Sequence, residues 1–451
     1  MALSRRQERL VPNTLPIHAS YAENFHCIGS ACEDTCCQGW GVFIDQAAYE
    51  KYQNLPAGQL HSLIGANLLA ISEGATSTNF AKIQMNGENQ CPLLTADRLC
   101  SIHSELGEDY LSHACATYPR TVQSIGGVHE KALTLSCPEA ARLVLLNPGL
   151  LTQRQSAVEN SRDEAPEAFS VDGASSFLPW SRSIRQAVLD LVANRVYPLW
   201  QRLFLLGVFC RRLDSIAKGE LDRSVPAFLK DFEASVAANT LRTAMEALPV
   251  DRASQLDVVL RMAGMLLRRS NIRPRFVECV QAFTSGIGNE PGATLESLTS
   301  HFDLAHNRYF APFIERQPHI LENYLVNTII RTRFPFGRQG AQSLSMAKEY
   351  AILTAQFALT KGFLIGVAGF HREQFSAEHV VHTVQATSKH FEHHPEFLDL
   401  AYQLLVESQM DGARGLAILL RNDQPEAPRP VVPELHLPGP HNDARAIKLQ
   451  N

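Results

Sequence analysis

The stretch FHCIGSACEDTCCQGW, residues 25–40, holds four cysteines with the spacing C-x4-C-x3-C-C. Three more lie in CPLLTADRLCSIHSELGEDYLSHACATYPR, residues 91–120, and an eighth lies in LTLSCPEA, residues 133–140. Only two of the ten cysteines fall in the rest of the chain. Thiolates bind soft and borderline metals, and four of them can hold a zinc ion or an iron–sulfur cluster. This concentration of thiols predicts a metal site in the N-terminal third.

Three interpretations of the clustered thiols compete. Disulfides need an oxidising compartment, and the N-terminus has neither an apolar segment nor a small-residue cleavage site that would target one. Structural zinc prefers paired C-x2-C knuckles, and this sequence has no C-x2-C. Iron–sulfur ligands can be irregularly spaced and drawn from distant segments. The spacing therefore disfavours disulfides and leaves zinc and iron–sulfur open.

The density of cysteines around each motif ranks the candidate ligands. Cys27 and Cys137 stand at the two ends of the cluster and are the weaker candidates. Cys210 and Cys279 lie in apolar helical stretches, where a free cysteine commonly fills space in the core. The preferred ligand pool is Cys32, Cys36, Cys37, Cys91, Cys100 and Cys115.

Length and composition limit the class of protein. A chain of 451 residues predicts two or three domains, and 45% apolar with 19% charged residues is typical of a soluble globular protein. The net charge of −5 offers no basic surface for nucleic acid. Apolar runs such as FLLGVF are too short to span a membrane, which needs about 20 residues. We expect a cytoplasmic protein, in a compartment that keeps thiols reduced.

The chain divides into four segments by composition. Residues 1–147 predict a mixed α/β cysteine-rich module, with short strands at 39–45, 81–86 and 129–137 and helices at 46–55, 105–118 and 138–146. Residues 148–176 are polar and predict a linker or surface loop. Residues 177–421 predict a helical domain, and the Pro-rich residues 422–451 predict a disordered tail.

Apolar residues recur at helical spacing throughout the predicted helical domain. Ile184, Val188, Leu191, Val192 and Val196 follow the pattern i, i+4, i+7, i+8, i+12. Such segments predict about eight or nine helices, so the fold class is mainly α with a small α/β cysteine-rich module. The turn FPFG, 334–337, either contacts that module or fills the helical core itself. The other periodic segments are 225–247, 254–269, 274–284, 294–313, 319–333, 343–369, 377–406 and 412–421.

The two cysteine stretches, 25–45 and 91–120, together resemble the N-terminal region of the flagellin lysine N-methylases. RVYPLWQRLFLLGVF (195–209) and LENYLVNTIIRTRFPFG (321–337) are similar to the helical region of that family. The resemblance covers residues 20–400, although C-x4-C-x3-C-C departs from the CxxCxxCC pattern of the wider group.

This resemblance implies methyl transfer from S-adenosylmethionine to the ε-amino groups of flagellin lysines, in the cytoplasm before export. It also implies a 4Fe-4S cluster held by the N-terminal cysteines, and so favours iron over zinc.

Lysine methylation sets chemical requirements for the site. A free lysine has a pKa near ~10.4, so burial or a base must favour the neutral amine that attacks the methyl group. Tyrosine, carboxylate and carbonyl groups suit such a pocket, and the candidates are Tyr118, Glu322, Asn323 and Tyr324. Each of them is also compatible with ordinary packing.

No familiar site for S-adenosylmethionine is visible. Gly126-Gly127 does not open a strand–turn–helix unit, and Gly39 stands where a C-x3-C-x2-C motif beginning at Cys32 would need its third cysteine. A non-catalytic metal-binding protein and an iron–sulfur redox protein are therefore the alternatives to a methylase.

Overall fold

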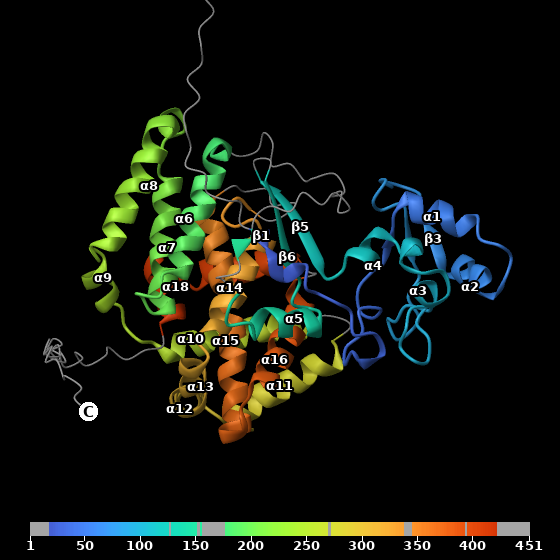
Figure 1. The fold of residues 1–451 in the computed structure, drawn as a ribbon. Helices are drawn as coiled ribbons and strands as arrows, with labels where there is room; N and C mark the ends of the chain where they lie inside the picture. Colours follow the sequence, from blue (N-terminus) through green and yellow to red (C-terminus); the bar gives the residue numbers. More distant parts are fainter. Residues whose placement is uncertain are drawn as a thin grey trace, which may run out of the picture.

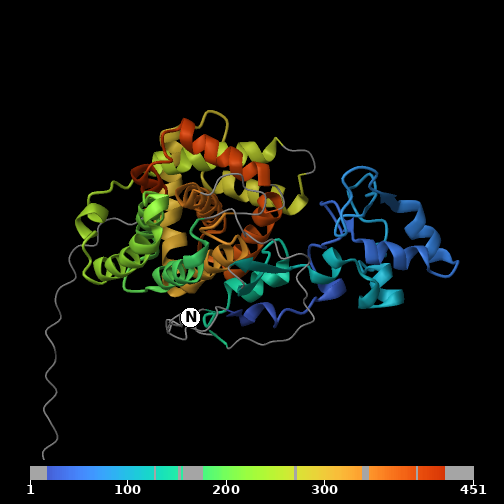
Figure 2. The same cartoon turned by 90° about the horizontal axis from the view of Figure 1, so that it is seen from above.

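The computed structural model describes residues 18–125, 128–150, 154–155, 176–268, 272–337, 345–392 and 395–421. Most of the predicted linker and all of the predicted tail lie outside these residues. Two views show a small body beside a larger helical one (Figures 1 and 2). We call residues 37–115 the cysteine lobe, because they share a small core. Residues 26–36 and 116–119 connect it to the other described residues, which we call the helical lobe.

The cysteine lobe is a three-stranded sheet with short helices around it. Its antiparallel strands have the order β2-β4-β3, and only ten residues form the buried core. Asp45 orients two of its helices, since the carboxylate accepts from Ala48 N (2.9 Å) and His113 N (2.7 Å). The elements are β2 Phe43–Ile44, α1 Gln46–Gln53, α2 Gln59–Asn67, β3 Leu68–Ala70, β4 Ala81–Ile83, α3 Ser101–Leu106 and α4 His113–Thr117.

The predicted helix over 105–118 is wrong. Gly107, with φ of 86°, ends α3, and Ser112 caps a separate helix α4 by accepting from Cys115 N. The strands predicted at 39–45 and 81–86 form, but they are only two and three residues long.

A β-hairpin and a helix lead from the cysteine lobe into the helical lobe. Strands β5 Arg120–Ile125 and β6 Val128–Leu133 pair antiparallel, and α5 Pro138–Leu145 begins at proline, as predicted. Ala132, Val144 and Tyr21 all belong to the main core. The main core therefore extends across the predicted boundary at 147. At its edge, β1 His18–Ala19 pairs with β7 Arg154–Gln155.

The helical lobe confirms a mainly α fold. Its described part has thirteen α-helices after residue 176, more than the predicted eight or nine. The segments 225–247, 294–313 and 377–406 each contain two helices, and the stretch 195–209 adds a further one. One break lies at Asn239, with φ of 51°. The helices are α6 Ser181–Ala193, α7 Leu199–Asp214, α8 Leu221–Ala237, α9 Arg242–Glu246, α10 Arg252–Leu267, α11 Pro274–Gly286, α12 Leu295–Ala305, α13 Ala311–Arg316, α14 His319–Arg331, α15 Met346–His371, α16 Ala377–Phe391, α17 Pro395–Glu407 and α18 Ala413–Leu420.

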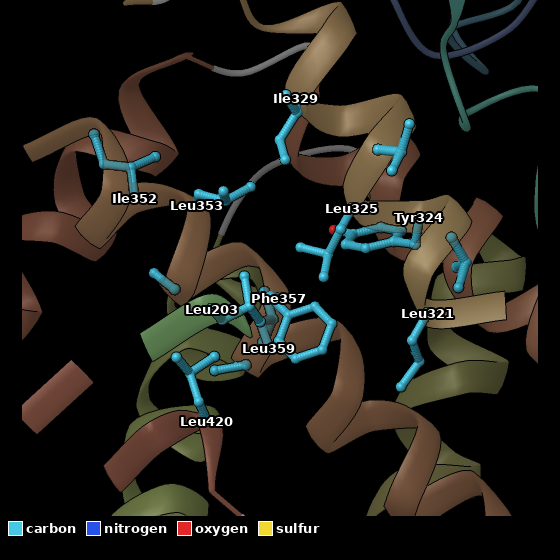
Figure 3. Packing of buried hydrophobic residues seen from close by; sticks show 14 of the residues in the cluster. Leu203, Leu321, Tyr324, Leu325, Ile329, Ile352, Leu353, Phe357, Leu359 and Leu420 are labelled. Atoms are coloured by element: carbon cyan, nitrogen blue, oxygen red, sulfur yellow. The ribbon is translucent and has the colours of Figure 1, made fainter. Parts of the chain in front are cut away.

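Helix α15 forms the axis of the helical lobe. It packs on α7, α10, α11, α16 and α17, and its residues meet α14 and α7 in the core (Figure 3). Its contact with α11 needs glycine, since a Cβ at Gly286 would overlap the carbonyl oxygen of Gly366. By length and composition α15 could cross a membrane, but its apolar stretch is entirely buried within the protein. Phe334 and Phe336 also belong to this main core. Because the core contains residues of both predicted domains, the two roles considered for the FPFG turn stay predictions.

Candidate active site between the cysteine and helical lobes

Four cysteines line the small core of the cysteine lobe. Cys91 is part of that core, and Cys37, Cys100 and Cys115 pack against it. Backbone hydrogen bonding draws three of their segments together: Cys91 N donates to Cys37 O (2.8 Å), and Leu94 pairs with Cys100 in a β-bridge. The fold thus brings thiols that are up to 78 positions apart in sequence into one lobe.

The thiols interact with one another. Burial raises the pKa of Cys91 to about 11, and the neighbouring Cys100, Cys115 and Cys36 contribute in the same direction. Burial likewise raises the pKa of Cys115 to about 11. A hydrogen bond to Cys37, together with burial, raises the pKa of Cys36 far above its usual range. Without a metal or another cation, these groups are therefore neutral thiols at neutral pH.

A second set of thiols lies toward the helical lobe. Cys137 caps α5 and is buried at the edge of the main core, which raises its pKa to about 12, and Cys32 and Cys36 add to this effect. Cys36 thus lies between the two sets. In the described ranges, no three histidine, cysteine or acidic side chains are arranged to hold a metal ion. The ligands named from the sequence, including the weaker Cys27 and Cys137, stay predictions.

The segment between the thiols docks on helix α16. Lys389 Nζ donates to Asp34 Oδ2 (2.9 Å) and to Thr35 O (3.0 Å), and Gln385 Nε2 donates to Asp34 Oδ2 (2.7 Å). Burial lowers the pKa of Lys389, and Asp34 offsets only part of that effect. Both side chains are largely buried, at 6% and 12% exposed. The pair therefore fixes the cysteine segment against the helical lobe.

We call the contact between residues 34–40 and helix α16 the junction. Arg273 adds a second cation there. Its guanidinium covers Gly39, where a Cβ would overlap it and where φ is 92°. Its Nη2 is buried and has no hydrogen-bond partner in the described part of the chain. Arg273 and Lys389 share one carboxylate, Asp34, so the junction has an excess positive charge. Such a surrounding fits an anionic group, and thiolates bound to a metal would supply one.

Tyr118, a predicted catalytic residue, lies at the same junction. Its ring stacks on Trp40 at a centroid distance of 5.8 Å, and Trp40 Nε1 donates to Cys36 O (2.5 Å). Its hydroxyl lies 3.1 Å from Ser136 Oγ. Burial, with a contribution from Cys137, raises the pKa of Tyr118 well above its usual range. Tyr118 is therefore a neutral phenol beside the thiols.

The other predicted catalytic residues lie on α14. Glu322 accepts from Arg202 Nη1 (2.6 Å) and Arg195 Nη2 (2.7 Å). Asn323 Nδ2 donates to two carbonyl oxygens at the end of α5, and the Tyr324 hydroxyl lies 3.1 Å from Thr360 Oγ1. Figure 3 shows Tyr324 among apolar side chains of the core. These partners give each of the three a role in joining α14 to its neighbours.

Sequence reasoning missed most of the groups at the junction. Asp34 stands inside the cysteine motif, and its position there was the one available signal. Lys389 and Gln385 lie on α16, about 350 residues from the thiols, in a segment with ordinary helical periodicity. Nothing in the local pattern distinguishes them from other helical residues.

Comparison with known proteins places the chain in a family. Two curated proteins called lysine-N-methylase, from Salmonella choleraesuis (strain SC-B67) and Salmonella typhimurium (strain LT2), are each 22% identical over 388 residues, covering 82% of this chain and 91% of theirs. The flagellar biosynthetic protein FliU of Salmonella muenchen is 29% identical over 130 residues, covering 29% of this chain and 76% of that protein. No solved structure matches. Residues 185–419, more than half of the chain, match the model of the FliB lysine N-methylase C-terminal domain, and the chain belongs to the FliB lysine N-methylase family.

Proposed function

We propose that this protein is a protein-lysine N-methyltransferase. The observation that carries the proposal is the extent of the likeness: relatives called lysine-N-methylase match 82% of the chain. A shared helical domain alone would leave the cysteine lobe unexplained. We assign the reaction to the junction, where thiols, cations and Tyr118 meet.

We further propose S-adenosylmethionine as methyl donor and flagellin as the protein that is modified. A relative with a flagellar name supports the choice of flagellin. The acceptors would be lysines on the surface of flagellin, methylated in the cytoplasm before export. The methyl donor is a sulfonium cation with an amino-acid carboxylate. Arg273 offers such a carboxylate a cation whose Nη2 has no partner among the residues that the structure describes.

An iron–sulfur cluster, 4Fe-4S in type, is proposed for the thiols of the cysteine lobe, with zinc as the alternative. Four thiols share one core: Cys37, Cys91, Cys100 and Cys115. Cys36 lies close enough to the last three of them to raise the pKa of each. When bound, the cluster would supply an anionic iron centre beside the junction. Lys389 and Arg273 complement that charge through their own positive charges.

The residues of the junction have distinct roles in this proposal. The stacked pair Trp40–Tyr118 forms an aromatic wall that excludes water from the reacting amine. The neutral phenol of Tyr118 orients the amine. Glu322, Asn323 and Tyr324 remain candidates from the sequence, with the structural partners described above.

The test uses anaerobically purified full-length protein, flagellin and S-adenosylmethionine. Mass spectrometry should find methyl groups on flagellin lysines, and elemental analysis should find iron with acid-labile sulfide. The double variant C36A/C37A should lose the cluster and the product. The matched control C210A/C279A removes two cysteines that are buried in the helical lobe and should keep both.

Two results would overturn parts of this proposal. Wild-type protein that binds metal and adds no methyl groups would favour a metal-binding or redox function, which the clustered thiols also support. Stoichiometric zinc without iron or sulfide would contradict the iron–sulfur assignment.

A further inference from the structure

A chain of hydroxyl groups connects Tyr118 to a buried carboxylate. The Tyr118 hydroxyl lies 3.1 Å from Ser136 Oγ, and Ser136 Oγ lies 3.1 Å from Thr134 Oγ1. Thr134 Oγ1 in turn donates to Glu392 Oε2. The four residues come from the end of α4, the segment after β6 and the end of α16, so the chain joins elements 258 positions apart.

The carboxylate at one end fixes the direction of every bond in this chain. Each hydroxyl has a single hydrogen, whereas an ionised carboxylate has none to give. Because Thr134 donates to Glu392, it can only accept from Ser136. Ser136 then has no hydrogen left for Tyr118, so Tyr118 must donate to Ser136.

The environment holds the chain in this direction. Thr134 is 5% exposed and Ser136 is 1% exposed, and the Glu392 side chain is 2% exposed. Arg331 Nη2 lies 3.2 Å from Glu392 Oε1, the oxygen that Thr134 does not use. Arg331 thus places its positive charge beside the carboxylate that accepts from Thr134. Because these groups are buried, little water can reach them to reverse the direction of the hydrogen bonds.

We propose that Glu392 acts through Thr134 and Ser136 to make Tyr118 a hydrogen-bond acceptor for the amine of the substrate lysine. This inference rests on the proposed methylation of lysine. With its hydrogen committed to Ser136, the Tyr118 oxygen presents only lone pairs to a ligand on the junction side. Tyr118 is then the residue that touches the amine, and Glu392, Thr134 and Ser136 are positioning residues.

The direction of the chain matters for the chemistry of methylation. A neutral amine attacks through its lone pair, so that lone pair must point at the methyl donor. A phenol that donated to the amine would occupy the lone pair and block attack. A phenol that accepts an N–H leaves the lone pair available and orients it. Reversing the direction of these hydrogen bonds should therefore inhibit the reaction without preventing the substrate lysine from binding.

A double-mutant cycle tests this coupling. Glu392→Gln keeps the shape of the carboxylate, but its amide can donate to Thr134 and so removes the fixed direction. We expect E392Q to lower kcat about tenfold or more, the loss of roughly one hydrogen bond to a charged group, and Y118F to lower it at least as much. In the Y118F background, E392Q should have almost no further effect. Equal losses from E392Q in both backgrounds would contradict the inference and give Glu392 a purely structural role.

Thr134 supplies a second variant with matched controls. Thr134→Val breaks the chain and should act like E392Q, while Thr134→Ser keeps the hydroxyl and should retain activity. Thr387→Val removes a buried hydroxyl on α16 whose hydrogen-bond partners among the described residues are carbonyl oxygens of the same helix, and it should leave kcat unchanged. Loss of activity in T134S, or its retention in T134V, would overturn the inference.

A spectroscopic readout keeps this inference separate from the proposed function. The Raman difference spectrum of wild type minus Y118F reports whether the phenol donates its hydrogen bond. We expect a donating phenol in wild type and a changed signal when the same difference is taken in the E392Q background. An unchanged signal would contradict the fixed direction, even if wild type proves inactive. An inactive wild type with the expected Raman signals would contradict the methylase proposal and leave the hydroxyl chain as described.

Discussion

The two lobes are stabilised in different ways. The helical lobe holds most of the buried apolar residues in the described part of the chain, whereas the cysteine lobe has a core of only ten buried residues. A core of that size supplies little stability, and small domains commonly need a metal or cross-links in addition. On the proposed assignment, a bound metal or cluster would add to the stability of the cysteine lobe, whereas the helical lobe has a large apolar core of its own.

The largest expected effect comes from a buried ion pair in the helical lobe. Arg185 pairs with Glu130, and their side chains are 3% and 6% exposed. Arg185 also donates to Ile329 O and Phe334 O, so it joins β6 to two helical segments. Glu130→Ala leaves this cation buried without its partner and should cost about 3–5 kcal/mol of unfolding free energy.

Urea unfolding of the helical lobe measures this loss. Glu23→Ala is the matched control, because Glu23 pairs with the neighbouring Lys131 at 3.7 Å in an exposed position. That variant should change stability by less than about 1 kcal/mol. A loss in E130A as small as in the control would show that the pair does not secure the helical lobe.

Acidification should also destabilise the helical lobe, through His306. Burial lowers the pKa of His306 to about 4, with further lowering by Arg252 and Lys361. Between about pH 6.5 and 4 the unfolded chain binds a proton that the folded chain does not, so stability falls as pH falls through this window. The contribution is about 3 kcal/mol at most.

Thermal unfolding of wild type and His306→Gln between pH 7 and 4.5 checks this expectation. The variant should lose the part of the pH dependence that comes from His306. Parallel profiles for the two proteins would contradict the assignment.

The smallest expected effect lies in the cysteine lobe. The Tyr52 hydroxyl donates to Tyr110 O (2.8 Å) and ties α1 to the segment before α4. Tyr52→Phe removes this bond and should cost about 1 kcal/mol. Hydrogen exchange should speed up in residues 37–115 only. Faster exchange across the helical lobe as well would show that the two lobes unfold together.

The sequence predicts the helices well and the junction poorly. The pattern from Ile184 to Val192 locates α6, and Pro138 marks the start of α5, because both signals are local. Asn239, whose backbone breaks one predicted helix, has no such signal. Tyr118 was a candidate by residue type alone. Its partner Glu392 could not be predicted, since the contacts that link them span more than 250 positions.

We propose that the junction between the lobes is the active site. Hydrogen exchange of the full-length protein, with and without S-adenosylhomocysteine, tests it most directly. We expect S-adenosylhomocysteine to slow exchange in residues 32–40, 115–120, 134–137 and 385–392. Protection confined to α14 around Glu322, with none in these four segments, would contradict the claim.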